Sequence, residues 1–234
     1  MGDYGKEIKA VIGKNFGDEG KGKCVDLLCA EAMEQGKKAV VVRHNGGAQA
    51  GHTVEGKNFR FVFHQLGSGC FRETPFYWSE TFLPDLVKLG EEADAFERIR
   101  GDNGAGHDAV AVYASPDCVC VTVFDVLLNS LAEELRREAR HGSCGMGIYE
   151  TVRRARSVTG GAVTFRLGDL EGKSTEEIAG MLKGSGTVTY PDDWRKYAGS
   201  WTAARKRPLT GTGCGIMSGS GFCVMTMCSG TRQI

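Results

Sequence analysis

The sequence predicts an α/β domain with a mostly parallel sheet, flanking helices and a P-loop-like nucleotide-binding site. Three observations support this class: β-branched runs at 8–12 and 38–43, an amphipathic pattern between them, and a glycine-rich loop after the first run. A strand, a helix and a second strand within about 30 residues form the β-α-β unit from which parallel sheets are built. With 234 residues, the chain is long enough to bury the core of one domain.

The later elements are expected to continue this alternation. Between the first two strands, apolar residues recur at helical spacing, at Val25, Leu28, Cys29 and Ala32. A third strand is predicted at 60–66 and a fourth at 119–123, from runs of β-branched and aromatic residues. Pro84 can occupy the first turn of a further helix, and residues 126–140 have a strong amphipathic helical pattern.

Composition divides the chain into three parts. Residues 1–185 form the predicted nucleotide-binding domain, and residues 186–207 form a connecting segment. Residues 208–234 are crowded with Gly, Ser, Thr, Cys and Met, have no hydrophobic period and are expected to be irregular. A flexible tail, a docking segment and the translation of a shifted reading frame all fit that composition.

Charge and composition exclude several classes of partner. Lys and Arg total 29 against 29 Asp and Glu, so no net field favours nucleic acid or an anionic membrane, and any phosphate site must be local. The sequence has no apolar signal core and no membrane-spanning run, so a cytoplasmic protein is expected. The nine cysteines match no zinc or redox template, and most are interpreted as small buried hydrophobic residues.

The first candidate site is the glycine-rich loop between the first strand and the first helix. It consists of Gly17, Asp18, Glu19, Gly20, Lys21, Gly22 and Lys23. Glycines let the backbone approach a ligand, and a helix N-terminus favours anions, so this loop suits a phosphate group. The spacing fits a P-loop, except that Cys24 stands where a Ser or Thr should bind magnesium. Asp18 would repel a phosphate unless Mg²⁺ lies between them; a solvated turn is the alternative.

The second candidate site, residues 43–53, follows the second strand. The carboxyl ends of parallel strands share one edge of a sheet, so this loop and the glycine-rich loop should face the same crevice. His52 lies among small residues, where it can donate to an oxygen or protonate a leaving group near neutral pH. His44 and His64 adjoin strands and are interpreted as core or edge residues, and His107 as part of a surface loop.

Residues 17–28 and 41–54 resemble the two signature segments of the adenylosuccinate synthetase family, in the same order and at about the same separation. Agreement extends to 64–69, to the glycine-rich segment 141–148, which resembles the family's nucleotide loop, and to 166–170. The likeness covers roughly residues 7–185.

The resemblance implies a homodimeric ligase that uses GTP and Mg²⁺ to join IMP and L-aspartate. A phosphoryl group passes from GTP to the purine 6-oxygen, and the amino group of aspartate then displaces it. In that scheme Asp18 takes the purine N1 proton and binds magnesium, His52 is the acid that stabilises the transferring phosphoryl group, and the Gly51 carbonyl is a second magnesium ligand.

The same resemblance implies two sets of binding residues. Those for GTP are Gly17, Asp18, Glu19, Gly20, Lys21, Gly22, Lys23, Gly51, His52 and Thr53. Those for IMP are Asp18, Glu19, Gly20, Lys21, Gln49, Ala50, Gly51, His52, Cys144 and Arg154. Arg154 is preferred over Arg153 and Arg156 as the arginine that reaches across the dimer.

The chain also departs from the family. Gln49 stands where the family generally has Asn, and Cys144 and Met146 replace residues that are usually Thr and Arg. Family members continue for about as long again and carry the guanine pocket and the aspartate-binding loop there. Two alternatives therefore stay open: a related ligase for another purine nucleotide, of the guanine type, and a truncated, non-catalytic nucleotide-binding remnant.

Overall fold

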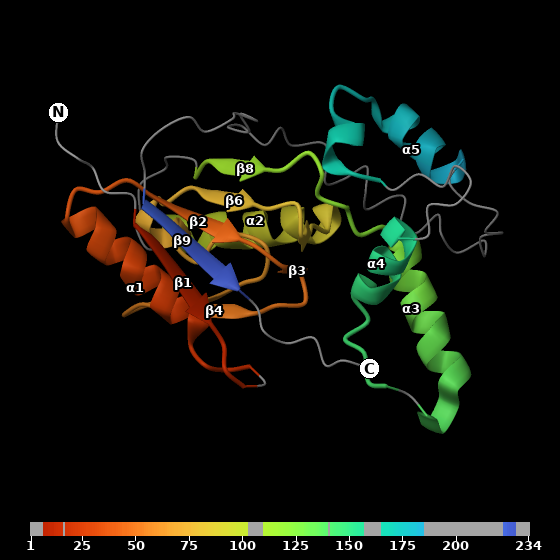
Figure 1. Cartoon of the computed structure of the whole chain (residues 1–234), viewed down its shortest axis with the longest axis horizontal. Helices are drawn as coiled ribbons and strands as arrows, with labels where there is room; N and C mark the ends of the chain where they lie inside the picture. The colour runs from red at the N-terminus through yellow and green to blue at the C-terminus, as the bar shows by residue number, and fades with distance from the viewer. Residues whose placement is uncertain are drawn as a thin grey trace.

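The computed structural model describes residues 7–15, 17–102, 110–139, 141–156, 165–184 and 222–227. A five-stranded sheet with the order β1-β9-β2-β6-β8 forms its centre (Figure 1). These strands are β1 (Ile8–Ile12), β9 (Phe222–Met227), β2 (Ala39–Arg43), β6 (Phe76–Trp78) and β8 (Val112–Ala114). All four pairings between them are parallel, which confirms the predicted α/β class.

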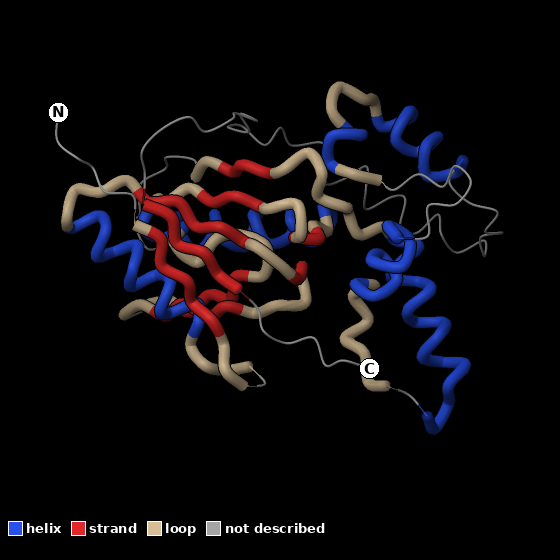
Figure 2. The backbone as a smooth tube through the Cα atoms, viewed as in Figure 1, coloured by secondary structure: helices blue, strands red, loops and turns tan. Residues whose placement is uncertain are grey.

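Five α-helices accompany the sheet in the described part of the chain. They are α1 (Lys21–Glu34), α2 (Leu86–Asp102), α3 (Val123–Arg136), α4 (Ile148–Arg156) and α5 (Thr175–Gly184). The three short 3₁₀ turns are η1 (Cys70–Arg72), η2 (Arg137–Ala139) and η3 (Leu167–Leu170). Figure 2 shows α2 behind the red strands, and α3, α4 and α5 to one side of them.

Two small two-stranded sheets adjoin the main one. Strand β3 (Gly46–Gly47) pairs in parallel with β7 (Phe82–Leu83), and β4 (His52–Glu55) pairs antiparallel with β5 (Arg60–Phe63). The strand predicted at 60–66 therefore ends early and belongs to a hairpin, not to the main sheet. In that hairpin His52 lies opposite Phe63.

Two other predicted elements differ in the structure. The fourth strand, predicted at 119–123, is wrong: Val119 forms an isolated bridge to Arg166, and the next two backbone N–H groups donate to different segments. Pro84 precedes α2 instead of lying in its first turn. The reason is that the Asp85 carboxylate accepts hydrogen bonds from the N–H groups of Val87 and Lys88, at 3.1 Å each, and so caps the helix start.

The expectation of irregular structure throughout 208–234 is wrong for Phe222–Met227. This segment is β9, which inserts between β1 and β2 with Val224 opposite Lys9 on one side and Val41 on the other. Strands of parallel sheets that are covered on both faces are continuous apolar runs, so the alternation by which a half-buried strand is recognised is not required of them. The connecting segment 186–207, the rest of the tail and His107 lie outside the described residues.

The core gathers between the sheet, α1 and α2. Phe61, Phe63, Phe71 and Phe96 form edge-on and tilted ring pairs between the β5 hairpin, η1 and α2. Among the cysteines whose burial the structure describes, four are buried, as expected for small hydrophobic residues, namely Cys29, Cys70, Cys118 and Cys120. Burial raises the pKa of the Cys29 thiol to about 11 and that of Cys118 to about 12, so both are protonated at neutral pH.

Candidate nucleotide-binding site

The glycine-rich loop turns the chain from β1 into α1 through a left-handed backbone. Gly17, Asp18 and Gly20 have φ values of 124°, 51° and 73°, and residues 17–20 are exposed. Aspartate is one of the few residues with a side chain that tolerates this region. Successive left-handed turns beside a helix N-terminus direct backbone N–H groups to one place, which is the geometry of an anion site.

The two carboxylates of this loop have different surroundings. Glu19 accepts a hydrogen bond from the Asn15 backbone N–H at 2.5 Å and pairs with the Lys21 ammonium at 3.2 Å. The Asn15 N–H is the main cause that lowers the pKa of Glu19. Because Glu19 has partners within its own loop, exposed Asp18 is the better candidate to face a metal or a substrate proton.

Helix α1 packs directly against the start of β4 at Gly22. A Cβ atom on Gly22 would lie 2.6 Å from the His52 carbonyl carbon, 2.7 Å from the Thr53 oxygen and 2.9 Å from the Thr53 nitrogen. Backbone atoms cannot yield at such distances, so only glycine fits here. This contact joins the two loops that the sequence predicted to share a crevice.

His52 is buried beside an equally buried arginine. Arg43, 1% exposed at the end of β2, donates from Nη1 to His52 Nδ1 at 2.6 Å and from Nη2 to the His64 carbonyl at 2.5 Å. Burial, and then the charges of Arg43, Lys21 and His64, lowers the pKa of His52 from 6.5 to about 3. The imidazole is therefore neutral at neutral pH. In this neutral form the His52 ring can donate a hydrogen bond to an oxygen and carries no positive charge.

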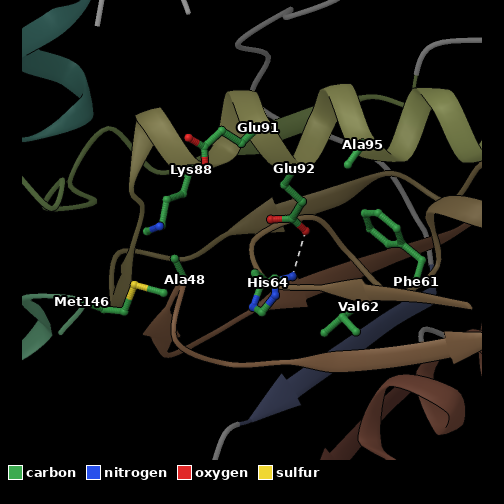
Figure 3. A pocket seen from close by; sticks show the side chains of 9 residues that line it. All are labelled: Ala48, Phe61, Val62, His64, Lys88, Glu91, Glu92, Ala95 and Met146. Atoms are coloured by element: carbon green, nitrogen blue, oxygen red, sulfur yellow. Dashed lines mark hydrogen bonds between the residues drawn. The ribbon is translucent and has the colours of Figure 1, made fainter. Parts of the chain in front are cut away.

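A pocket of about 290 Å³ lies beside the second loop (Figure 3). Its lining residues are Ala48, Phe61, Val62, His64, Lys88, Glu91, Glu92, Ala95 and Met146. The buried Glu92 carboxylate accepts the backbone N–H groups of His64 and Gln65, each at 2.8 Å, and that of Leu66 at 3.2 Å. The His64 ring makes a 2.9 Å hydrogen bond through Nδ1 to the Ala50 carbonyl. Glu92 thus fixes the backbone of residues 64–66, and His64 connects that segment to Ala50 of the second loop.

The glycine-rich segment 141–148 leads into α4 and contacts both α3 and the second loop. Gly147, at φ 64°, fits against α3, because a Cβ there would lie 2.6 Å from the Asp125 carbonyl carbon. A Cβ on Gly47 would lie 2.9 Å from Ile148 Cδ1, and Met146 lines the pocket with Ala48. Cys144 is exposed, and its neighbour Ser143 bonds to Asn129 of α3 at 2.8 Å.

Arg154 is held within its own chain. Its guanidinium forms a two-pronged pair with Asp125, at 3.0 and 2.8 Å, and donates to the Cys120 carbonyl at 2.7 Å. The Asp125 carboxylate is only 2% exposed, so it requires this partner. The structure therefore does not support Arg154 as the arginine that crosses a dimer. Arg153 and Arg156, both exposed on α4, are the better candidates.

The remaining candidates lie around the same edge. Gln49, Gly51 and Lys23 are exposed, whereas Ala50, Lys21 and Thr53 are half-buried. The described residues contain no cluster of three or more His, Cys, Asp or Glu side chains. Mg²⁺ usually takes one or two protein oxygens together with phosphate oxygens and water, so a site for it does not need such a cluster. No helix in the described ranges is both long and apolar enough to span a membrane.

The roles of two residues that organise the site were not predicted from the sequence, although Arg43 is the first residue of the second candidate loop. Arg43 ends an apolar strand, and Glu92 lies on the inner side of α2. A charged residue at a position that should be buried was the available signal in both cases, because such groups are rarely buried unless they are paired.

Comparison with known proteins agrees with this arrangement. The sequence pattern of the family described as adenylosuccinate synthetase matches residues 10–183. The chain belongs to this family. It is 34% identical over 153 residues to the adenylosuccinate synthetase of Pseudomonas aeruginosa, a match that covers 62% of this chain and 31% of that protein. The corresponding protein of Stutzerimonas stutzeri is 33% identical over 62% of this chain and 76% of its own length.

Solved structures share the fold of this adenylosuccinate synthetase family member. The fully ligated adenylosuccinate synthetase of Plasmodium falciparum superposes with a TM-score of 0.61 at 22% identity, over 86% of this chain and 45% of that one. The succinoaminodeoxyadenylate synthetase of cyanophage S-2L, bound to dGMP and dATP, gives a TM-score of 0.55 at 18% identity over 96% and 52%. The chain spans about a third of the length of the Pseudomonas relative and about half of the solved proteins.

Proposed function

We propose that this chain acts as an adenylosuccinate synthetase, which ligates IMP and L-aspartate at the expense of GTP. The observation that carries the proposal is the backbone contact of Gly22 with His52 and Thr53, because it joins a phosphate-binding loop to a histidine loop. Family membership over residues 10–183 supports the reaction class.

The groups on this edge suit the chemistry of both steps. Asp18 takes the purine N1 proton, so that the 6-oxygen can attack the γ-phosphorus while the bond to GDP breaks. The amino nitrogen of aspartate then bonds to C6, and phosphate leaves with the 6-oxygen. The backbone N–H groups of residues 17–20, with Lys21 and Lys23, hold phosphate oxygens. His52, being neutral, donates a hydrogen bond to the phosphoryl group from Nε2.

Magnesium has a place in this proposal. Asp18 and the Gly51 carbonyl would hold Mg²⁺, which neutralises phosphate charge when it is bound. In a dimer, Arg153 or Arg156 would extend toward the partner's nucleotide.

A ligase for a guanine-type nucleotide is the second candidate. It is favoured by the apolar side chain of Met146, which lines the pocket beside Ala48 where the family usually carries Arg. The cyanophage protein of similar fold is bound to dGMP, so a substrate panel must include that nucleotide.

Calorimetric titration with IMP, dGMP and GTP, each with Mg²⁺, followed by a turnover assay with aspartate, tests the proposal. We expect IMP and GTP to bind, and Asp18→Asn to lower kcat by about 10²–10⁴-fold, the usual contribution of a general base. Asp94→Asn, an exposed change on α2, is the matched control.

Each alternative has its own outcome. Turnover with dGMP and not with IMP would favour the guanine-type ligase. A cooperatively folded chain that binds none of the nucleotides would indicate a non-catalytic remnant. Undiminished turnover in Asp18→Asn would refute the proposed role of Asp18.

A further inference from the structure

Arg43 occupies the centre of the sheet's carboxyl-end edge. It is the last residue of β2 and pairs in register with Trp78 of β6 and Thr226 of β9. Ligands of open α/β sheets bind outside this edge, so a residue here can act on a bound group or on the side chains that touch it. At 1% exposure, Arg43 can act only through its neighbours.

The direction of the hydrogen bond between Arg43 and His52 is fixed by chemistry. A guanidinium donates and never accepts, so His52 Nδ1, 2.6 Å from Arg43 Nη1, must be the acceptor. In a neutral imidazole the second nitrogen then carries the hydrogen. His52 is therefore the Nε2–H tautomer.

The guanidinium itself has little freedom to turn. Its other prong donates to the His64 carbonyl at 2.5 Å, and its carbon lies 5.3 Å from the centre of the Phe82 ring. The His64 segment is anchored in turn by Glu92, as the dashed line in Figure 3 shows. A planar fork that bonds two fixed acceptors fixes the plane and the position of its partners.

We propose that Arg43 is a positioning residue that selects the Nε2–H tautomer of His52 and orients its ring. This inference rests on the proposed function, in which His52 donates to the phosphoryl group. A lysine at position 43 would keep the charge, but its single ammonium lacks the two-pronged geometry that joins Nδ1 to the His64 carbonyl. Arg43→Lys should therefore free the ring while the charge stays.

Nitrogen-15 NMR of the imidazole rings reads the tautomer directly. In a chain with ¹⁵N-labelled histidine, His52→Gln identifies the His52 signals by their loss. We expect wild-type Nδ1 to have the signal of a nitrogen without hydrogen and Nε2 that of a protonated nitrogen. Arg43→Lys should show exchange between both tautomers, with kcat lowered about 10–100-fold, as for other residues that orient a functional group, and KM little changed.

Arg100→Lys is the matched control, because Arg100 is 3% exposed and lies over the ring of Phe96 at 5.5 Å, as Arg43 lies over Phe82. It should leave the His52 signals and kcat unchanged. Hydrogen on Nδ1 in the wild type would overturn the proposal, even if Arg43→Lys does not fold. So would a folded Arg43→Lys with the wild-type tautomer and kcat. The expected tautomers in a chain without turnover would sustain the positioning role and refute the proposed function.

Discussion

The region of β1, α1 and the β4–β5 hairpin differs from the region of α3 and α4 in how its motif residues are held. In the first region, two loops meet through backbone atoms at Gly22, and a buried network fixes His52. In the second, the resembling residues bond to side chains of the neighbouring helix α3: Arg154 bonds to Asp125, and Ser143 bonds to Asn129. A motif thus names candidate residues, whereas packing decides which of them can reach a common ligand.

The largest effect is expected at the ion pair of the second region. Arg154→Met leaves the buried Asp125 carboxylate with its hydrogen bonds from Thr122 but without its charged partner, and removal of one member of a buried ion pair lowers the free energy of unfolding by about 3–5 kcal/mol. Denaturant unfolding monitored by circular dichroism measures this loss.

Arg153→Met provides the control on the same helix. Arg153 is exposed and lies 6.0 Å from the centre of the Tyr149 ring, so its loss should change the unfolding free energy by less than about 1 kcal/mol. Equal effects of the two substitutions would contradict a structural role for Arg154 and restore it as a candidate for contact with substrate.

Sequence reasoning succeeded where the signal is local. The β1-α1-β2 unit and its glycine-rich loop follow from periodicity and from glycine spacing within one stretch of chain. Strand β9 escaped, because its partners β1 and β2 lie far away in the sequence and its flanks are rich in Gly and Ser. Arg43 and Glu92 escaped for a related reason: their roles depend on acceptors and donors that other segments supply.

A pH-dependent effect is expected from His52, because its buried imidazole distinguishes the first region from an exposed loop. Its folded pKa of about 3 lies below the ordinary value of 6.5, so the unfolded chain binds the extra proton first as the pH falls. The contribution of neutral His52 is complete above pH 6.5 and is lost toward pH 3, with a slope approaching about 1.4 kcal/mol per pH unit.

Comparison of wild type with His52→Gln across this pH range isolates the effect. The difference in unfolding free energy between the two proteins should change steadily below pH 6.5. A difference that is independent of pH would show that His52 is accessible and titrates normally.

The central claim, that the first region forms one phosphate site from two loops, is tested most directly by calorimetric titration of Gly22→Ala with GTP and Mg²⁺. The added methyl group must displace the His52 and Thr53 backbone, so the affinity for GTP should fall about tenfold or more, in line with a cost of about 1–3 kcal/mol for overpacking. Gly180→Ala on α5 is the control. A Cβ atom added at Gly180 would contact nothing within 4 Å beyond its own helix, so this variant should bind GTP as the wild type does. Equal GTP affinity of Gly22→Ala and the wild type, or no GTP binding by either, would contradict the account.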